Sequence, residues 1–258
     1  MRQTNTSPSD SPLSASMKLF VLGDSHVRPA RHALEQGWFG RIAWQVEEVG
    51  GATAVGLRHP TSKTQALVRF RECLLPFNPD IVPVFQLGEV DCGFVIWVRA
   101  QRHNESVVQQ LAESLQAYRN FLCEMRNTGY ENLIVTSAML PTLLDGALDG
   151  VVAHLRREVK ATMRERTDLT LEYNERLRKI CHQENLLFAD FTPHLLDPTT
   201  RTIKDSFRHP DPADHHLHPE HGGRLWVELV GKKLQEGPRF TISSALRRFR
   251  RIWHRWQQ

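Results

Sequence analysis

Short apolar runs alternate with amphipathic stretches along most of the chain. The apolar runs predict five buried strands, over Lys18–Leu22, Trp44–Val49, Asp80–Leu87, Asn132–Ser137 and Leu186–Asp190. Apolar residues at helical spacing predict helices over Thr61–Leu75, Asn104–Arg126, Thr167–Glu184 and Glu220–Leu234. This alternation of strands and helices predicts a flavodoxin-like, three-layer α/β/α fold with a central, mostly parallel, five-stranded sheet.

The composition changes at both ends of the chain. Residues 1–16 are rich in Ser, Thr, Pro and Asn and lack the apolar core of a signal peptide, so we interpret them as a disordered leader. We expect one domain over 17–237, in which the irregular, charged stretch 141–166 forms an insertion or lid. Residues 238–258 form a basic amphipathic tail.

Within this tail, segment 243–258 combines arginines with an apolar stripe at helical spacing, made by Leu246, Phe249, Trp253 and Trp256. Such a helix suits an anionic membrane surface or a protein partner. The stripe could equally dock on the body of the same protein.

Composition and charge narrow the choice of function. The 258 residues are 40% hydrophobic, enough to build a core without a disulfide or a metal. The net charge of +4 comes largely from the tail, so nucleic-acid binding is not favoured. There is no apolar run long enough to cross a membrane, and the four cysteines are scattered. We expect a cytoplasmic protein, with peripheral membrane contact through the tail as an option.

Candidate chemistry clusters where the predicted strands end. Ser25 follows the first strand, at a sharp turn that offers backbone N–H groups to a developing oxyanion. Gly51 follows the second strand, segment 88–91 follows the third, and a histidine-rich segment over 209–223 precedes the last helix. Because the carboxyl ends of parallel strands share one edge of the sheet, these loops should meet there.

A serine nucleophile needs a base, and the base needs an orienting carboxylate. The histidine-rich segment supplies both, because Asp214 precedes the histidines His215, His216, His218 and His221. The same residues could also bind a metal, but no fixed ligand spacing is present, so we predict no metal and no cofactor.

In these features the chain resembles the SGNH/GDSL hydrolase superfamily. The four sequence blocks of that family are similar, in order, to Gly23-Asp24-Ser25, to Gly50 or Gly51, to Gly88-Glu89-Val90-Asp91, and to the region from Asp214 to His218. The resemblance implies an ester hydrolase with Ser25 as nucleophile, a histidine as base and Asp214 as its orienting group. It also implies oxyanion or substrate-binding roles near Gly50, Gly51 and Gly88. For Asp91 two roles stay open, a brace of its own loop or a contact with the oxyanion or substrate. We interpret His26 as a residue at the start of a helix or at the rim of the site, where it could also touch substrate.

The sequence departs from the family pattern at two points. The family places its histidine three residues after the aspartate, whereas here His218 lies four residues after Asp214 and His216 lies two after it. We prefer His218, which is followed by Pro219 and a glycine as in the family, and keep His216 as the alternative. The second departure is Val90, which stands where the family has an asparagine that donates to the oxyanion.

Two functions follow from this pattern. The first is an esterase that cleaves O-acyl groups, such as acetyl groups on carbohydrates, through an acyl-enzyme; acyl transfer is a variant of it. The second, motivated by Val90, is a catalytically weak or non-hydrolytic protein that binds or transfers acyl groups on a glycan or a lipid-linked intermediate. In either case the expected partner is a small-molecule or glycan ester and not a nucleic acid.

Overall fold

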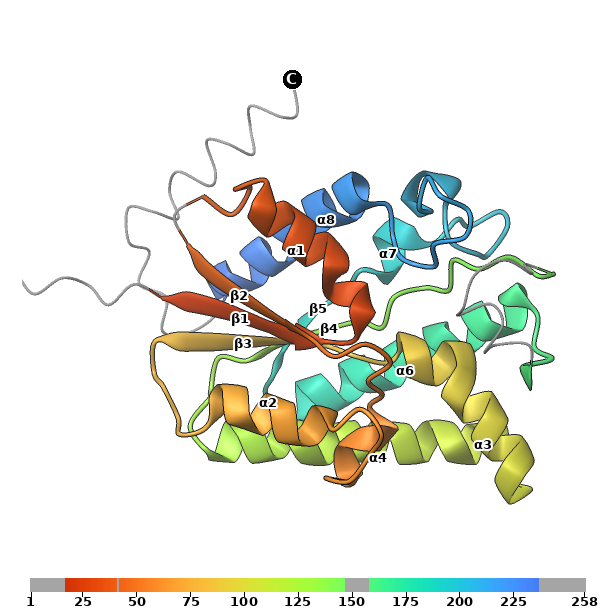
Figure 1. Ribbon diagram of the computed structural model, residues 1–258, viewed down its shortest axis with the longest axis horizontal. Coiled ribbons are helices and arrows are strands. Elements are labelled where there is room, and N and C mark those ends of the chain that lie inside the picture. Colours follow the sequence, from red (N-terminus) through yellow and green to blue (C-terminus); the bar gives the residue numbers. More distant parts are fainter. Residues whose placement is uncertain (1–16, 41, 147–157, 237–258) are drawn as a thin grey trace, which may run out of the picture.

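The computed structural model describes residues 17–40, 42–146 and 158–236, and a five-stranded parallel sheet runs through its centre (Figure 1). The strands are β1 (Lys18–Gly23), β2 (Ala43–Glu48), β3 (Ile81–Gln86), β4 (Ile134–Thr136) and β5 (Leu187–Ala189). They lie in the order β2-β1-β3-β4-β5, and every neighbouring pair is parallel. The predicted fold class and all five predicted strands are therefore confirmed.

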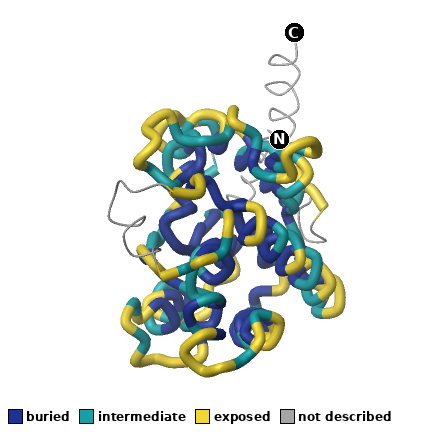
Figure 2. The backbone as a smooth tube through the Cα atoms, turned by 90° about the vertical axis from the view of Figure 1, so that its right-hand side faces the viewer, coloured by how far each residue is buried: buried dark blue, intermediate teal, exposed yellow. Residues whose placement is uncertain are grey.

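Buried apolar side chains cover both faces of the sheet, as expected for strands that are apolar along their whole length. Successive residues of β1 divide between two core clusters: Phe20 and Leu22 belong to one, and Leu19 and Val21 to the other. Figure 2 shows the buried residues gathered in the middle of the molecule, with the exposed ones along its outer loops and helices. Because both faces of the sheet are packed, the strands are held in place, and so are the points at which the loops leave their carboxyl ends.

Three helices pack on one face of the sheet (Figure 1). They are α1 (Arg28–Glu35), α7 (Thr192–Leu195) and α8 (Pro219–Glu236). The fully buried Trp226 of α8 lies 5.3 Å, between ring centroids, from Phe191 just before α7. This layer holds the start of α8 beside α1, and α1 in turn follows the turn that contains Ser25.

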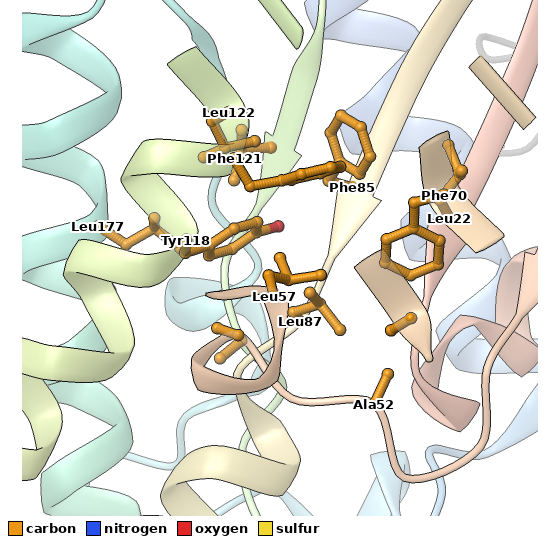
Figure 3. Close-up of a cluster of buried hydrophobic side chains, with 14 of the residues drawn as sticks. Leu22, Ala52, Leu57, Phe70, Phe85, Leu87, Tyr118, Phe121, Leu122 and Leu177 are labelled. Atoms are coloured by element: carbon orange, nitrogen blue, oxygen red, sulfur yellow. The ribbon is translucent and has the colours of Figure 1, made fainter. Parts of the chain in front are cut away.

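The opposite face is covered by α2 (Ala66–Leu74), α4 (Val107–Asn127) and α6 (Met163–Gln183), with α3 (Ile96–His103) at the periphery (Figure 1). Their core is aromatic, with the Phe121 ring centroid 5.2 Å from that of Phe85 and 6.1 Å from that of Phe70 (Figure 3). Aromatic rings at these separations stabilise a core beyond the area that they bury.

The predicted helices are present, but several boundaries differ. Helix α2 begins at Ala66 rather than Thr61, because the preceding residue, Gln65, has a left-handed backbone with φ of 52°. Helix α6 begins at Met163, inside the predicted insertion 141–166, where Thr162 and Glu165 form a capping box. Helices α1 and α3 were not predicted. They are short, and the chain enters α3 through a π-helical turn over Asp91–Val95 that breaks the helical period.

Three sequence predictions concern residues outside the described part of the chain. They are the disordered leader 1–16, the middle of the insertion at 147–157, and the basic tail 238–258 with its segment 243–258. In the part of the chain that the structure describes, no helix is long and apolar enough to cross a membrane.

Asp91 holds the loop that follows β2. Its carboxylate accepts the backbone N–H of Ala54 at 2.7 Å and of Val55 at 3.1 Å, and the Ser114 hydroxyl at 2.7 Å. The side chain is fully buried. Of the two roles that the sequence left open for Asp91, these three bonds support the brace of the loop and not the contact with the oxyanion or substrate. Burial raises its pKa to about 6, against the opposing effect of these bonds.

We expect Asp91→Asn to lower the free energy of unfolding by about 1–3 kcal/mol at pH 7, because the new amide NH₂ faces a buried donor. A carboxyl with a raised folded-state pKa stabilises the fold below its unfolded pKa, and this stability is lost as the pH rises through about 6. The difference between wild type and Asp91→Asn should therefore widen as the pH falls from 7 to 5. Urea unfolding at both pH values measures it.

Asp80→Asn is the matched control, because Asp80 is exposed. It should unfold like the wild type at both pH values. Equal stability of Asp91→Asn and Asp80→Asn would show that Asp91 does not brace this loop.

Candidate active site

The loops that carry the candidate residues leave the carboxyl ends of β1, β2 and β3 and meet the loop before α8 there. The turn after β1 depends on Gly23, because a Cβ at this position would lie 2.2 Å from the carbonyl oxygen of Gln86 on β3. Asp24 then caps a 3-10 helix over Ser25–Val27 by accepting the His26 backbone N–H at 2.8 Å. Ser25 thus begins a short helix and is 8% exposed.

Asp214 orients His216. One oxygen, Oδ1, accepts the His216 backbone N–H at 2.8 Å and also lies 2.5 Å from His216 Nδ1. The short contact with a carboxylate oxygen assigns the ring proton to Nδ1, which leaves the lone pair on Nε2. Nε2 is buried and has no hydrogen-bond partner among the described residues. His216 therefore presents an oriented, unpaired nitrogen.

Burial lowers the pKa of His216 to about 3, and the neighbouring His26 and His215 add to this effect, although Asp214 opposes it. The imidazole is consequently neutral near pH 7. For Asp214, burial alone would raise the pKa, but the hydrogen bonds from the backbone and ring of His216 lower it overall. The pair at neutral pH is thus a carboxylate beside a neutral imidazole.

His218, the preferred base in the sequence analysis, has a different role. Its Nδ1 accepts the backbone N–H of Glu220 at 3.2 Å and of His221 at 3.5 Å, at the start of α8. Its ring stacks on that of His221, with 4.2 Å between centroids. The structure therefore pairs Asp214 with the alternative base, His216. The ring nitrogen of His218 instead accepts hydrogen bonds from the first turn of α8.

His26 is buried between two carboxylates. Its Nδ1 lies 3.1 Å from Asp24 Oδ1, and its Nε2 lies 3.4 Å from Glu89 Oε2. His26 lies at the start of a helix, as one of its two interpretations has it, but the side chain is 1% exposed, so the other interpretation, a residue at the rim that could touch substrate, is wrong. The reason is the turn itself, because Asp24 binds both the backbone and the ring of His26 and draws the ring inward.

The three glycines predicted for this edge have different surroundings. Gly50 and Gly51 lie exposed in the turn after β2, where Gly51 has φ of 72°. Gly88 has φ of 114°, and a Cβ there would lie 2.8 Å from both Ala138 and Tyr173. Gly88 therefore shapes the third loop from its buried side, whereas Gly51 is exposed to solvent.

A hollow of about 240 Å³ opens beside His216, between α1 and the loop before α8. Its polar lining is made by Arg28, Arg31, His32, Glu35, His209 and Asp214. Arg28 and Arg31 both pair with Glu48, at 3.0 and 3.1 Å, so much of their charge is compensated. His216 and Asp214 line this hollow, whereas Ser25 is not among its lining residues.

Sequence reasoning missed two parts of this edge. Ser114, from α4, helps to hold Asp91, and nothing in the local pattern of that helix indicates it. His215 lies beside His216, with ring centroids 3.9 Å apart, and sequence reasoning gave it no place in the triad. One usable signal was present in the sequence: Asp24-Ser25-His26 and Asp214-His215-His216 share the spacing Asp-x-His.

Comparison with known proteins gives a consistent picture of the fold. No protein-family model matches the sequence. The search of curated proteins finds no match either. Among solved structures, a GDSL-like lipase from Bacteroides thetaiotaomicron has a TM-score of 0.58 at 13% identity, covering 88% of this chain and 92% of the other.

Two esterases are also similar. An aryl esterase from M. smegmatis has a TM-score of 0.52 at 13% identity, covering 85% of this chain and 99% of the esterase. A carbohydrate acetylesterase from Sinorhizobium meliloti has a TM-score of 0.53 at 10% identity, covering 86% and 100% of the two chains. At such identities the likeness concerns the fold, and this chain has the fold of SGNH/GDSL hydrolases, as its resemblance to that superfamily predicts.

Proposed function

We propose that the protein is a serine esterase in which Ser25 is the nucleophile, His216 the general base and Asp214 the group that orients His216. The observation that carries the proposal is the Asp214–His216 pair, which leaves Nε2 of a buried, neutral imidazole without a partner. Ser25 adjoins His26, whose ring centroid lies 5.0 Å from that of His216. The nucleophile and the base thus belong to neighbouring turns.

The proposed reaction has two steps. The Ser25 hydroxyl attacks the ester carbonyl carbon while His216 Nε2 takes its proton, and the alcohol then leaves with that proton. Water attacks the resulting acyl-enzyme, again giving a proton to His216. The acid is then released, and the proton returns to Ser25. Backbone N–H groups of Ser25 and Gly51 would hold the oxyanion, since Val90 has no side-chain donor.

The substrate class proposed is a small O-acyl ester, with acetylated carbohydrates as the leading case. Solved structures with this fold include a carbohydrate acetylesterase and an aryl esterase, which supports ester cleavage without fixing the alcohol. The hollow of about 240 Å³ beside His216 suits a small group rather than a long acyl chain.

A second candidate function is a weak or non-hydrolytic protein that binds or transfers acyl groups on a glycan or lipid-linked intermediate. Val90 favours it, because losing one oxyanion donor lowers kcat by about 10²–10³. Val90 is half-buried at the start of the π-helical turn over Asp91–Val95, on the loop that follows β3.

We expect Ser25→Ala to abolish labelling by a fluorophosphonate probe and to lower kcat/KM for p-nitrophenyl acetate by about 10³-fold or more. The readouts are in-gel fluorescence and absorbance of the released nitrophenol. Ser206→Ala, on the loop before α8, is the matched control and should label like the wild type. Equal labelling of Ser25→Ala and wild type would exclude Ser25 as the nucleophile.

A second experiment separates the two candidate bases. His216→Ala should lower kcat by about 10²–10⁴-fold, because general base catalysis is lost. His218→Ala should keep kcat within about threefold and instead lower the free energy of unfolding by about 1 kcal/mol, because the first turn of α8 loses an acceptor. The reverse pattern of kcat values would restore His218 as the base.

The second candidate function is tested at Val90. If a missing donor limits turnover, Val90→Asn should raise kcat by about tenfold or more, with little change in KM. Val90→Leu, which offers no donor, should leave kcat unchanged. An unchanged kcat in Val90→Asn would mean that backbone donors already serve the oxyanion.

A further inference from the structure

Three imidazoles from two distant segments meet at the turn that contains Ser25. His26, His215 and His216 each offer a ring nitrogen, and these three atoms lie within 4.8 Å of one another. The ring centroids of His26 and His215 are 5.4 Å apart, and those of His26 and His216 are 5.0 Å apart. His26 and His216 are buried and His215 is half-buried. Only the fold brings these residues together, since 189 positions separate the first from the second (215 − 26).

Two of the imidazoles are held by the same arrangement. Asp24 accepts the backbone N–H of His26 and contacts its Nδ1, and Asp214 does the same for His216. A carboxylate on one ring nitrogen fixes the orientation of the ring and makes the other nitrogen a better ligand, which is the usual outer arrangement of metal-bound histidines. In His216 that other nitrogen is buried and has no hydrogen-bond partner among the described residues.

We infer that His26, His215 and His216 form a binding site for a divalent transition-metal ion of the Zn²⁺ type. Imidazole nitrogens suit such borderline ions. Three histidines with one open position is a set that binds zinc in proteins. The carboxylates of Asp24, Glu89 and Asp214 contact these rings at 3.1, 3.4 and 2.5 Å and favour a nearby positive charge.

To bind a metal ion, the three ring nitrogens would have to move slightly closer together. Ligand nitrogens around a tetrahedral zinc ion at about 2.0–2.1 Å lie about 3.3 Å apart, compared with at most 4.8 Å here. His215 is the half-buried member of the three, and its partial exposure would give an ion access to the cluster.

The site has a direct consequence for the esterase proposed above, although the binding itself does not rest on that activity. The His216 Nε2 lone pair that would accept the Ser25 proton is the one that would bind the metal. Metal and proton transfer therefore exclude one another, so a bound ion inhibits hydrolysis. The free protein is the hydrolytic form.

Calorimetric titration of the full chain with ZnSO₄, after dialysis against EDTA, tests the inference. The wild type should bind one equivalent, and His215→Ala should bind about tenfold or more weakly. His221→Ala removes an exposed histidine that is stacked on His218, away from the cluster, and should bind like the wild type. Thermal unfolding without metal checks that the variants are folded.

Co²⁺ provides a second readout that does not depend on turnover. The wild type should show the intense visible absorption of a tetrahedral Co²⁺ site, and His215→Ala should lose it. Absence of saturable Zn²⁺ binding in the wild type, or equal affinity in wild type and His215→Ala, would overturn the inference. Because neither readout uses an ester, failure of the esterase proposal alone would leave these results unchanged.

Discussion

The site depends on two aspartates, each of which contacts both the backbone and the ring of one histidine. In Asp24-Ser25-His26 and in Asp214-His215-His216, one carboxylate oxygen accepts the backbone N–H two residues ahead and also contacts that residue's Nδ1. The first contact makes a tight turn, and the second fixes the ring on it. The middle residue of each turn, Ser25 or His215, is then presented beside an immobilised imidazole. One local interaction thus orients both halves of the site.

The fold brings the two turns together through constraints that lie elsewhere. Gly23 allows the end of β1 to approach the Gln86 carbonyl closely, which sets where the first turn begins. Helix α8 packs beside α1, which sets where the second turn ends. The buried Asp91 carboxylate holds the loop after β2 by accepting two of its backbone N–H groups. Each of these contacts is buried, so the edge of the sheet is rigid before any ligand arrives, and preorganisation of this kind is what proton transfer requires.

The sequence was sufficient for the fold because buried parallel strands are apolar along their whole length and glycine follows several of them. It was less informative for the site, where the role of a residue depends on the hydrogen bonds of single atoms. The proline and glycine that follow it favoured His218, yet helix α8 needs an acceptor for its first N–H groups and uses the His218 ring. Asp91 and His26 looked like polar loop residues, and only tertiary contacts show that both are buried. His215 acquires a role only when the loop before α8 reaches the turn after β1.

Placing three imidazoles and three carboxylates at one half-buried edge has an electrostatic consequence. Burial and the neighbouring imidazoles lower the pKa of His216, so its ring is neutral at neutral pH. A neutral ring that Asp214 orients offers its Nε2 lone pair, and in the two proposals above this lone pair takes the proton of Ser25 or binds a metal ion, but not both at once. The same feature that makes His216 available as the proposed base therefore makes it available as the proposed ligand.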